Sequence, residues 1–160
     1  MPNGSTTGAV GFAPEEIDPT LPTRSARLKW VIVVNGSLPA GRAANAAVCV
    51  AAATSRAVTG LLGDDAIDAG GAAHPGLPWA GCSVLAADAA TLHTIRTKAA
   101  ASGTCHVADM PAAAQHTRVY ADYLATVKET QAEDIEYYAV SLVGPRNRID
   151  KIVGRLPLLA

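Results

Sequence analysis

The turn after the first apolar run carries residues suited to holding a negative charge or a carbonyl oxygen. The segment KWVIVVNGSLPAGRAANAA contains Asn35 and Ser37, then Gly41 and a helix-forming run of alanines. The first N–H groups of a helix have no intrahelical partner, and the helix dipole adds positive potential there. Arg42 in the first turn is unfavourable beside the positive end of the dipole, and an anion bound next to it would compensate for this. The pattern therefore fits either an anion site or an exposed arginine without a ligand. The spacing matches neither GxGxxG nor GxxxxGK[ST].

A second concentration of charge lies near the C-terminus. Arg146, Arg148, Lys151 and Arg155 place four cations close together in the sequence, against Asp150 alone. Such a patch could contact phosphates, or it could be a solvated helix face. The whole chain has 13 Lys and Arg against 14 Asp and Glu, a formal charge of −1. Overall charge therefore does not favour a protein that binds nucleic acid by electrostatics alone.

A glycine-rich loop contains a group of metal-ligating residue types, namely Asp64, Asp65, Asp68 and His74. The spacing misses the EF-hand pattern and lacks its terminal glutamate, so a plain polar loop is favoured and no metal is predicted.

A second group lies around a predicted strand end, where His106 and Asp109 are followed by His116 and Thr117. These residues could supply an acid–base pair, or a histidine that hydrogen-bonds a loop carbonyl.

Composition places the chain among folded cytoplasmic proteins. Of the 160 residues, 49% are hydrophobic and 17% charged, which indicates a single domain of ordinary size. Cys49, Cys82 and Cys105 form no CxxC pair, and an odd number of cysteines without a secretion signal predicts reduced thiols in the cytoplasm. No apolar run is long enough to cross a bilayer, so no membrane contact is predicted, and no cofactor is predicted.

Strands alternate with helices from residue 28 onward. The run 29–35, apolar without alternation from Trp30 to Val34, is typical of a strand covered on both faces. Asp88 is a suitable N-cap for a helix that would bury Leu92, Ile95 and Ala99. The predicted strands are 29–35, 81–87, 104–108 and 137–143, and the predicted helices are 41–57, 89–101, 111–128 and 145–153. This order predicts a single α/β domain over 28–160, and residues 1–27, rich in Pro, Gly, Ser and Thr, predict a flexible or wrapping N-terminal extension.

Two blocks near the chain ends resemble the type II peptidyl-tRNA hydrolases. The first block is Lys29, Leu38, Gly41-Arg42 and Ala46-Ala47-Val48-Cys49; the second is Gly144-Pro145, Ile149-Asp150-Lys151, Val153-Gly154 and Leu156. Between them the chain resembles an uncharacterised bacterial family that shares the same fold, through Asp68-Ala69-Gly70, His74-Pro75-Gly76-Leu77 and the run from Thr117 to Tyr123. The resemblance covers about residues 28–159. It implies a peptidyl-tRNA hydrolase II-like α/β fold, a four-stranded mixed β-sheet flanked by helices on both faces.

The resemblance also implies a hydrolase chemistry with Lys29, Asp109 and Thr117 as catalytic residues. Asp109 would orient the water that attacks the ester between peptide and tRNA, and Lys29 would stabilise the oxyanion. The residues implied to bind substrate are Asn35, Gly41, Arg42, Asn45, His74 and Arg146. The chain departs from the family where the hydrolases carry an arginine after the first strand and a lysine, a glutamine and a histidine in the helix; here these are Asn35, Ala44, Val48 and Ala51.

Two functions remain open on these grounds. The first is a hydrolase of peptidyl-tRNA, or of a smaller acyl ester or amide, and it requires Lys29, Asp109 and the helix N-terminus to converge at the carboxyl ends of strands. The second is a non-catalytic binding module on the same scaffold that recognises a small anionic ligand or a protein partner. A homodimer is also expected, from the habit of the family and because the apolar end 156–159 must be covered by the domain or by a second copy.

Overall fold

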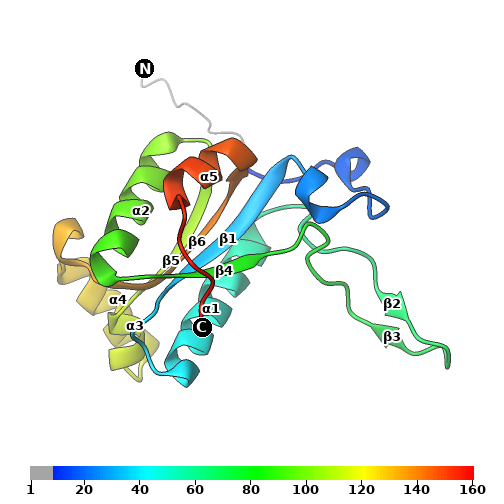
Figure 1. Cartoon of the computed structure of the whole chain (residues 1–160). Coiled ribbons are helices and arrows are strands. Elements are labelled where there is room, and N and C mark those ends of the chain that lie inside the picture. The colour runs from blue at the N-terminus through cyan, green and yellow to red at the C-terminus, as the bar shows by residue number, and fades with distance from the viewer. Residues whose placement is uncertain (1–8) are drawn as a thin grey trace, which may run out of the picture.

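The computed structural model describes residues 9–160, and a four-stranded sheet forms its centre (Figure 1). Its strands are β1 (Leu28–Asn35), β4 (Ser83–Ala87), β5 (His106–Pro111) and β6 (Tyr137–Pro145). They lie in the order β4-β1-β6-β5; β1 pairs parallel with β4, and β6 is antiparallel to both of its neighbours. The predicted α/β class and mixed four-stranded sheet are confirmed.

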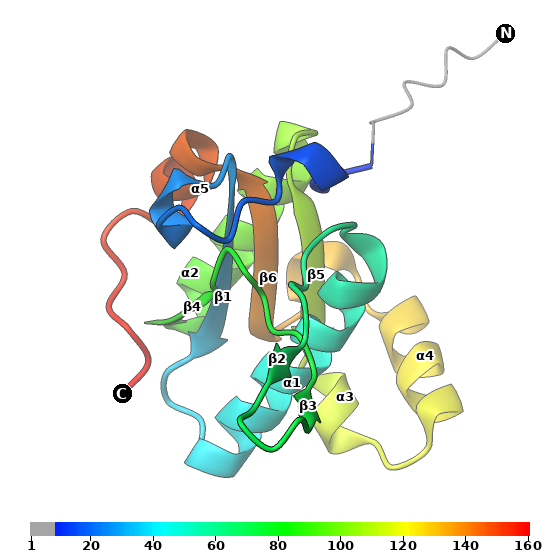
Figure 2. The same cartoon turned by 90° about the vertical axis from the view of Figure 1, so that its right-hand side faces the viewer.

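Helices cover both faces of this sheet. The helix α1 (Ala40–Ala57) lies on one face, and α2 (Ala89–Ser102) and α5 (Arg146–Val153) lie on the other (Figures 1 and 2). Alternate residues of β1 enter two separate cores, because successive side chains of a strand point to opposite faces. Ile32 and Val34 pack on the α1 side, whereas Val31 and Val33 pack under α2 and α5. Burial on both faces explains the unbroken apolar run from Trp30 to Val34 in this strand.

The helix α2 matches its sequence prediction in detail. The Asp88 carboxylate accepts a hydrogen bond from the Thr91 backbone N–H at 2.7 Å, which makes it the N-cap. Gly103 ends the helix with φ of 67°, a conformation that glycine adopts without steric cost. Leu92, Ile95 and Ala99 are buried against the sheet as expected.

The predicted helix over 111–128 is instead two short helices preceded by an extended strand. The strand β5 continues to Pro111, α3 spans Ala113–His116 and α4 spans Tyr120–Glu129. Thr117 and Val119 both have extended backbone between the two helices. Their β-branched side chains are compatible with extended backbone and lower helix propensity slightly, in keeping with a break at this point.

Residues 9–27, which we call the strap, lie against the domain. The strap contains two short 3-10 helices, η1 (Pro14–Glu16) and η2 (Thr23–Ser25). Phe12 is 5% exposed, its backbone N–H donates to the Thr59 carbonyl at 2.9 Å, and its ring lies 4.8 Å from that of Trp79. The strap therefore wraps the domain rather than extending freely. Residues 1–8 of the predicted extension lie outside the described part of the chain.

Residues 62–78, predicted as loop, form an arm that projects away from the sheet (Figure 1). Its outer part is a small hairpin of β2 (Ala66–Ile67) and β3 (Ala73–His74). At its base, a side chain on Gly76 would meet the Gly63 carbonyl oxygen at 1.8 Å, so the two backbones can cross only because Gly76 has none.

The apolar C-terminal end lies mostly along the edge of β4. The Ala86 backbone N–H donates to the Pro157 carbonyl at 2.9 Å, and Leu159 donates to Val84 at 3.0 Å. Leu156 and Leu159 pack on the two cores, whereas Leu158 is 68% exposed. The domain itself thus covers most of this end, and the homodimer stays a prediction. Among residues 9–160, no helix combines the length and the apolar character that crossing a bilayer requires.

Candidate functional site

Lys29 and Asp109 do not converge on one cleft. Lys29 is opposite Gly144 on β6, and Asp109 is opposite Val140, which is itself opposite Val33 on β1. Lys29 and Val33 are four positions apart on β1, so Lys29 and Asp109 are offset by about 13 Å along the strand direction. Two strand spacings, about 10 Å, separate β1 from β5 across the sheet. The expectation that Lys29 and Asp109 converge at one hydrolase site is therefore wrong.

Each of these two residues has its own ion pair. The Lys29 ammonium Nζ lies 2.7 Å from Asp150 Oδ1 on α5, and Arg96 Nε of α2 donates to Asp109 Oδ2 at 3.1 Å. Neither charge is set to activate water or to hold an oxyanion, because each faces a counter-ion of the same molecule.

The acid–base pair of His106 and Asp109, one of two alternatives left open by the sequence, is absent as well. The two residues are three positions apart on β5, so their side chains point to opposite faces of the sheet. Burial lowers the pKa of the His106 imidazole, and its Nε2 has no hydrogen-bond partner among the described residues.

The turn residues Asn35, Gly41, Arg42 and Asn45 lie together at the end of β1 and the start of α1. The buried Asn35 side chain accepts hydrogen bonds from the Ser37 backbone N–H at 3.0 Å and from the Ser37 hydroxyl at 2.7 Å. It thereby shapes the turn and does not face a ligand. The turn lies at the opposite end of β1 from Lys29.

Gln115 of α3 closes over the first turns of α1. Its Nε2 donates to the Arg42 carbonyl at 2.9 Å and to Asn45 Oδ1 at 3.2 Å. Asn45 thus links two helices, which accounts for this residue structurally. The Arg42 side chain points into solvent.

Thr117 lies at the end of α3, remote from Lys29. Its hydroxyl donates to the Ala113 carbonyl at 3.0 Å, while the neighbouring His116 Nε2 lies 3.0 Å from the Tyr138 hydroxyl. Both residues line a pocket of about 440 Å³ beneath α4, which we call the apolar pocket.

His74 lies on the projecting arm and is 63% exposed. Its Nε2 is 3.2 Å from Asp68 Oδ2, and the other oxygen of Asp68 accepts from the Gly70 and Ala72 backbone N–H groups. Asp65 likewise accepts from the Gly76 backbone N–H. These side chains hold the hairpin together. Across residues 9–160, no three His, Cys, Asp or Glu side chains gather in an arrangement that could hold a metal ion.

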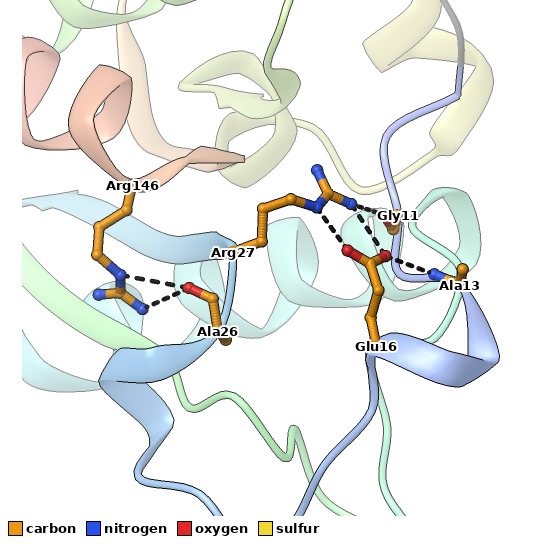
Figure 3. A network of polar contacts seen from close by, with 6 residues as sticks. All are labelled: Gly11, Ala13, Glu16, Ala26, Arg27 and Arg146. Carbon is orange, nitrogen blue, oxygen red and sulfur yellow. Dashed lines mark hydrogen bonds and ion pairs between the residues drawn. The ribbon is translucent and has the colours of Figure 1, made fainter.

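Arg146, the first residue of α5, ties the strap to the domain (Figure 3). Its guanidinium donates through Nε and Nη2 to the Ala26 carbonyl and through Nη2 to the Thr23 carbonyl, at 3.3 to 3.4 Å. Nearby, the Arg27 Nε donates to Glu16 Oε1 at 2.6 Å, and Glu16 Oε2 also accepts from the Ala13 backbone N–H. The hydrogen bond from Arg27 lowers the pKa of Glu16 to about 2.

The predicted residues Lys29 and Arg146 do meet, in a pocket beside the strap that we call the cationic pocket. Its volume is about 330 Å³, and Arg24 of the strap supplies a third cation to its wall. The remaining lining residues are Thr23, Trp30, Ala80, Gly81, Cys82 and Ser83. Three cations on one concave wall concentrate positive potential and favour an anion.

Cys82 does not add a nucleophile to this pocket. The residue reaches the surface, yet the burial of its thiol raises the pKa to about 12. The thiol is therefore protonated at neutral pH, whereas the reactive form of cysteine is the thiolate.

Three cations of the C-terminal cluster lie on α5 and line different pockets. Arg146 faces the strap, whereas Arg148 and Lys151 line a separate small pocket with Thr104. Asp150 points toward Lys29. Arg146 is thus separated from Arg148 and Lys151, which line a different pocket.

The model of one protein family matches residues 28–160, most of the chain. That family is described as "Protein of unknown function (DUF2000)". The chain belongs to the DUF2000 family.

The structure of another protein resembles this DUF2000 chain. It is a protein of unknown function from Agrobacterium tumefaciens strain C58, 17% identical in sequence, with a TM-score of 0.74. The match covers 84% of this chain and 98% of the other. At this identity the similarity concerns the fold. Among curated proteins, none matches the chain significantly.

Sequence reasoning missed the strap's part in the site of this DUF2000 chain. Arg24 lies in a segment rich in Pro, Ser and Thr, where nothing periodic marked it as part of a folded unit. A signal did exist in Phe12 and Ile17, apolar residues that a freely extended segment would expose to water. Both pack against the core.

Proposed function

We propose that this chain is a non-catalytic binding module that holds a small anionic ligand in the cationic pocket. We further propose that its scaffold is of the peptidyl-tRNA hydrolase II type, as the motifs at both chain ends suggest. The observation that carries the binding proposal is the placement of Arg24, Lys29 and Arg146 on the wall of one pocket.

The three cations differ in how they are held. Arg146 is fixed by hydrogen bonds through Nε and Nη2 to carbonyls of the strap, and these bonds leave its Nη1 for another acceptor. Lys29 is paired with Asp150, whose side chain is 53% exposed, so the ion pair is accessible to a competing anion. Arg24 is exposed on η2 and completes the wall from the strap. A phosphate or carboxylate group would meet one fixed and two adjustable donors.

The geometry favours this function over ester hydrolysis. Hydrolysis would need a group that activates water and a group that stabilises the oxyanion within reach of the same atom. Lys29 and Asp109 are instead neutralised by separate partners at different levels of the sheet. The cationic pocket has no carboxylate or imidazole among its lining residues.

Titration with inorganic phosphate, followed by changes in backbone amide NMR signals, tests this proposal. We expect signals of residues 23–30 and 80–83 to shift, and Arg24→Gln and Lys29→Gln each to weaken binding about tenfold, since charge-assisted hydrogen bonds contribute about 1.5–3 kcal/mol. Arg56→Gln on the exposed end of α1 is the matched control, and it should leave the affinity unchanged. Equal affinity for phosphate in all three variants would refute the proposal that the cationic pocket binds the anion.

A second measurement separates binding from catalysis. Deacylation of a peptidyl-tRNA mimic is compared between the unmodified protein and Lys29→Ala. We expect both rates to equal the uncatalysed rate. A faster reaction that Lys29→Ala abolishes would restore the hydrolase and reject a purely binding role.

A further inference from the structure

The apolar pocket beneath α4 is built from four parts of the chain that meet at one edge of the sheet. Its floor is the end of β5 with Pro111 and Ala112; its sides are α3, α4 and the segment before β6. The apolar lining residues are Pro111, Ala112, Ala113, Val127 and Ile135. A volume of about 440 Å³ is within the range of pockets that bind small molecules.

The hydroxyl groups of this pocket are already used by the protein. Thr117 donates to the Ala113 carbonyl, Thr126 to the Asp122 carbonyl and Thr130 to the Thr126 carbonyl, at 2.7 to 3.0 Å. A ligand therefore finds no free hydroxyl donor among these threonines. His116 is likewise engaged, since its Nε2 lies 3.0 Å from the Tyr138 hydroxyl.

The remaining polar groups on the wall are carboxylates. Asp134 and Glu136 flank Ile135 in the sequence, line the pocket and are exposed to solvent. Neither side chain takes part in a hydrogen bond or ion pair within the described residues. No lysine or arginine lines this pocket, so its wall carries negative charge beside an apolar floor.

We propose that the apolar pocket is a second binding site, which takes a small organic cation: an ammonium group carried by a hydrocarbon chain or ring. The hydrocarbon part covers Ala112, Val127 and Ile135, which removes apolar surface from water. The ammonium group lies at the rim, where the Asp134 and Glu136 carboxylates accept its hydrogen bonds. This site is independent of the cationic pocket and prefers a ligand of opposite charge.

The test compares two ligands of equal chain length and opposite charge, hexylammonium and hexanoate. Amide NMR titration of the full chain reports both the affinity and the site, through the signals of Ala113 and Val127. We expect hexylammonium to bind about fivefold more tightly than hexanoate, as two exposed charge contacts of about 0.5 kcal/mol each would give.

One double variant and two single variants test the origin of that preference and the location of the site. Asp134→Asn and Glu136→Gln keep the side-chain shape and should together abolish the preference for the cation. Glu133→Gln, a neighbouring exposed carboxylate that does not line the pocket, is the matched control and should preserve it. Ala113→Phe fills the pocket and should prevent both ligands from binding.

The proposal is overturned if hexanoate binds as tightly as hexylammonium, or if the shifts map elsewhere. Failure of both ligands to bind at millimolar concentration would overturn it as well. Urea unfolding of each variant establishes that a loss of binding is not a loss of folding.

Discussion

The cationic pocket and the apolar pocket lie at opposite ends of the central sheet and differ in the segment that closes each. The cationic pocket is closed by the strap, which buries Phe12 and is held by Arg146 and by the Arg27–Glu16 pair. The apolar pocket is closed by α4, in which no residue is buried. A segment with a buried anchor unfolds with the core, whereas a segment without one opens locally at low cost.

This difference indicates how each pocket would respond to a ligand. The cationic pocket has donors that the folded core has already positioned, so a ligand gains little from rearrangement. The wall of the apolar pocket formed by α4 has no buried residue, so we expect it to open more readily, and a ligand that restricts this opening would carry an entropic cost. Three experiments test the comparison, in order of decreasing expected effect.

Removing the buried anchor of the strap should have the largest effect. Phe12→Ala takes an aromatic side chain out of the α1-side core and should lower the free energy of unfolding by about 3–5 kcal/mol. Val127→Ala, the corresponding truncation on α4, removes a half-buried side chain and should cost about 1 kcal/mol. Urea denaturation measures both. Equal losses would show that α4 is as firmly attached as the strap.

Acid should loosen the strap before it unfolds the sheet. The folded-state pKa of Glu16 is about 2, below its ordinary value of 4.5, mainly because Arg27 hydrogen-bonds the carboxylate. A lowered pKa contributes stability above the unfolded pKa, and this contribution disappears as pH falls from about 4.5 to 2.

Tryptophan fluorescence reports this loosening, because Trp79 lies against Phe12 of the strap. We expect a change in emission over that pH range while far-ultraviolet circular dichroism stays constant. Arg27→Met should remove the acid-dependent step, since the Glu16 pKa then returns toward its ordinary value. A step that persists unchanged in this variant would assign it to another carboxyl group.

Removing Asp150, which competes with a ligand for Lys29, should have the smallest effect, and it should increase the affinity for phosphate. Asp150→Asn frees the Lys29 ammonium for a ligand and should raise phosphate affinity about two- to fivefold, the equivalent of an exposed ion pair. Asp109→Asn removes another ion-paired carboxylate, which lies on β5 away from the cationic pocket. It should leave phosphate affinity unchanged. Calorimetric titration with phosphate measures both, and a rise in both variants would indicate a general charge effect.

Prediction from sequence succeeded where a pattern reports on burial. The apolar run of β1 and the spacing of Leu92, Ile95 and Ala99 each follow from which side chains must leave water. It failed at 111–128, where alanines favour a continuous helix but Thr117 and Val119 adopt extended backbone. Local propensity was too weak there to predict where the helix breaks.

The candidate site was harder to predict, and one of its errors could have been avoided. Lys29 is the second residue of β1 and Asn35 is its last, so six residue steps of about 3.3 Å each hold them roughly 20 Å apart. A lysine near the start of a strand cannot reach the N-terminus of a helix that follows the far end of the same strand. Chain geometry alone would have separated Lys29 from Gly41 and Arg42.

The sequence by itself determined the α/β class, the mainly apolar central strands and the N-cap of α2, because these depend on local periodicity and on hydrogen bonds within a few residues. The tertiary structure alone decided which charges meet. Lys29 contacts Asp150 across 121 positions of the chain, and Arg146 contacts Ala26 across 120. Contacts at such separation depend on the order of strands in the sheet and on the packing of helices over it, and no local pattern encodes that order.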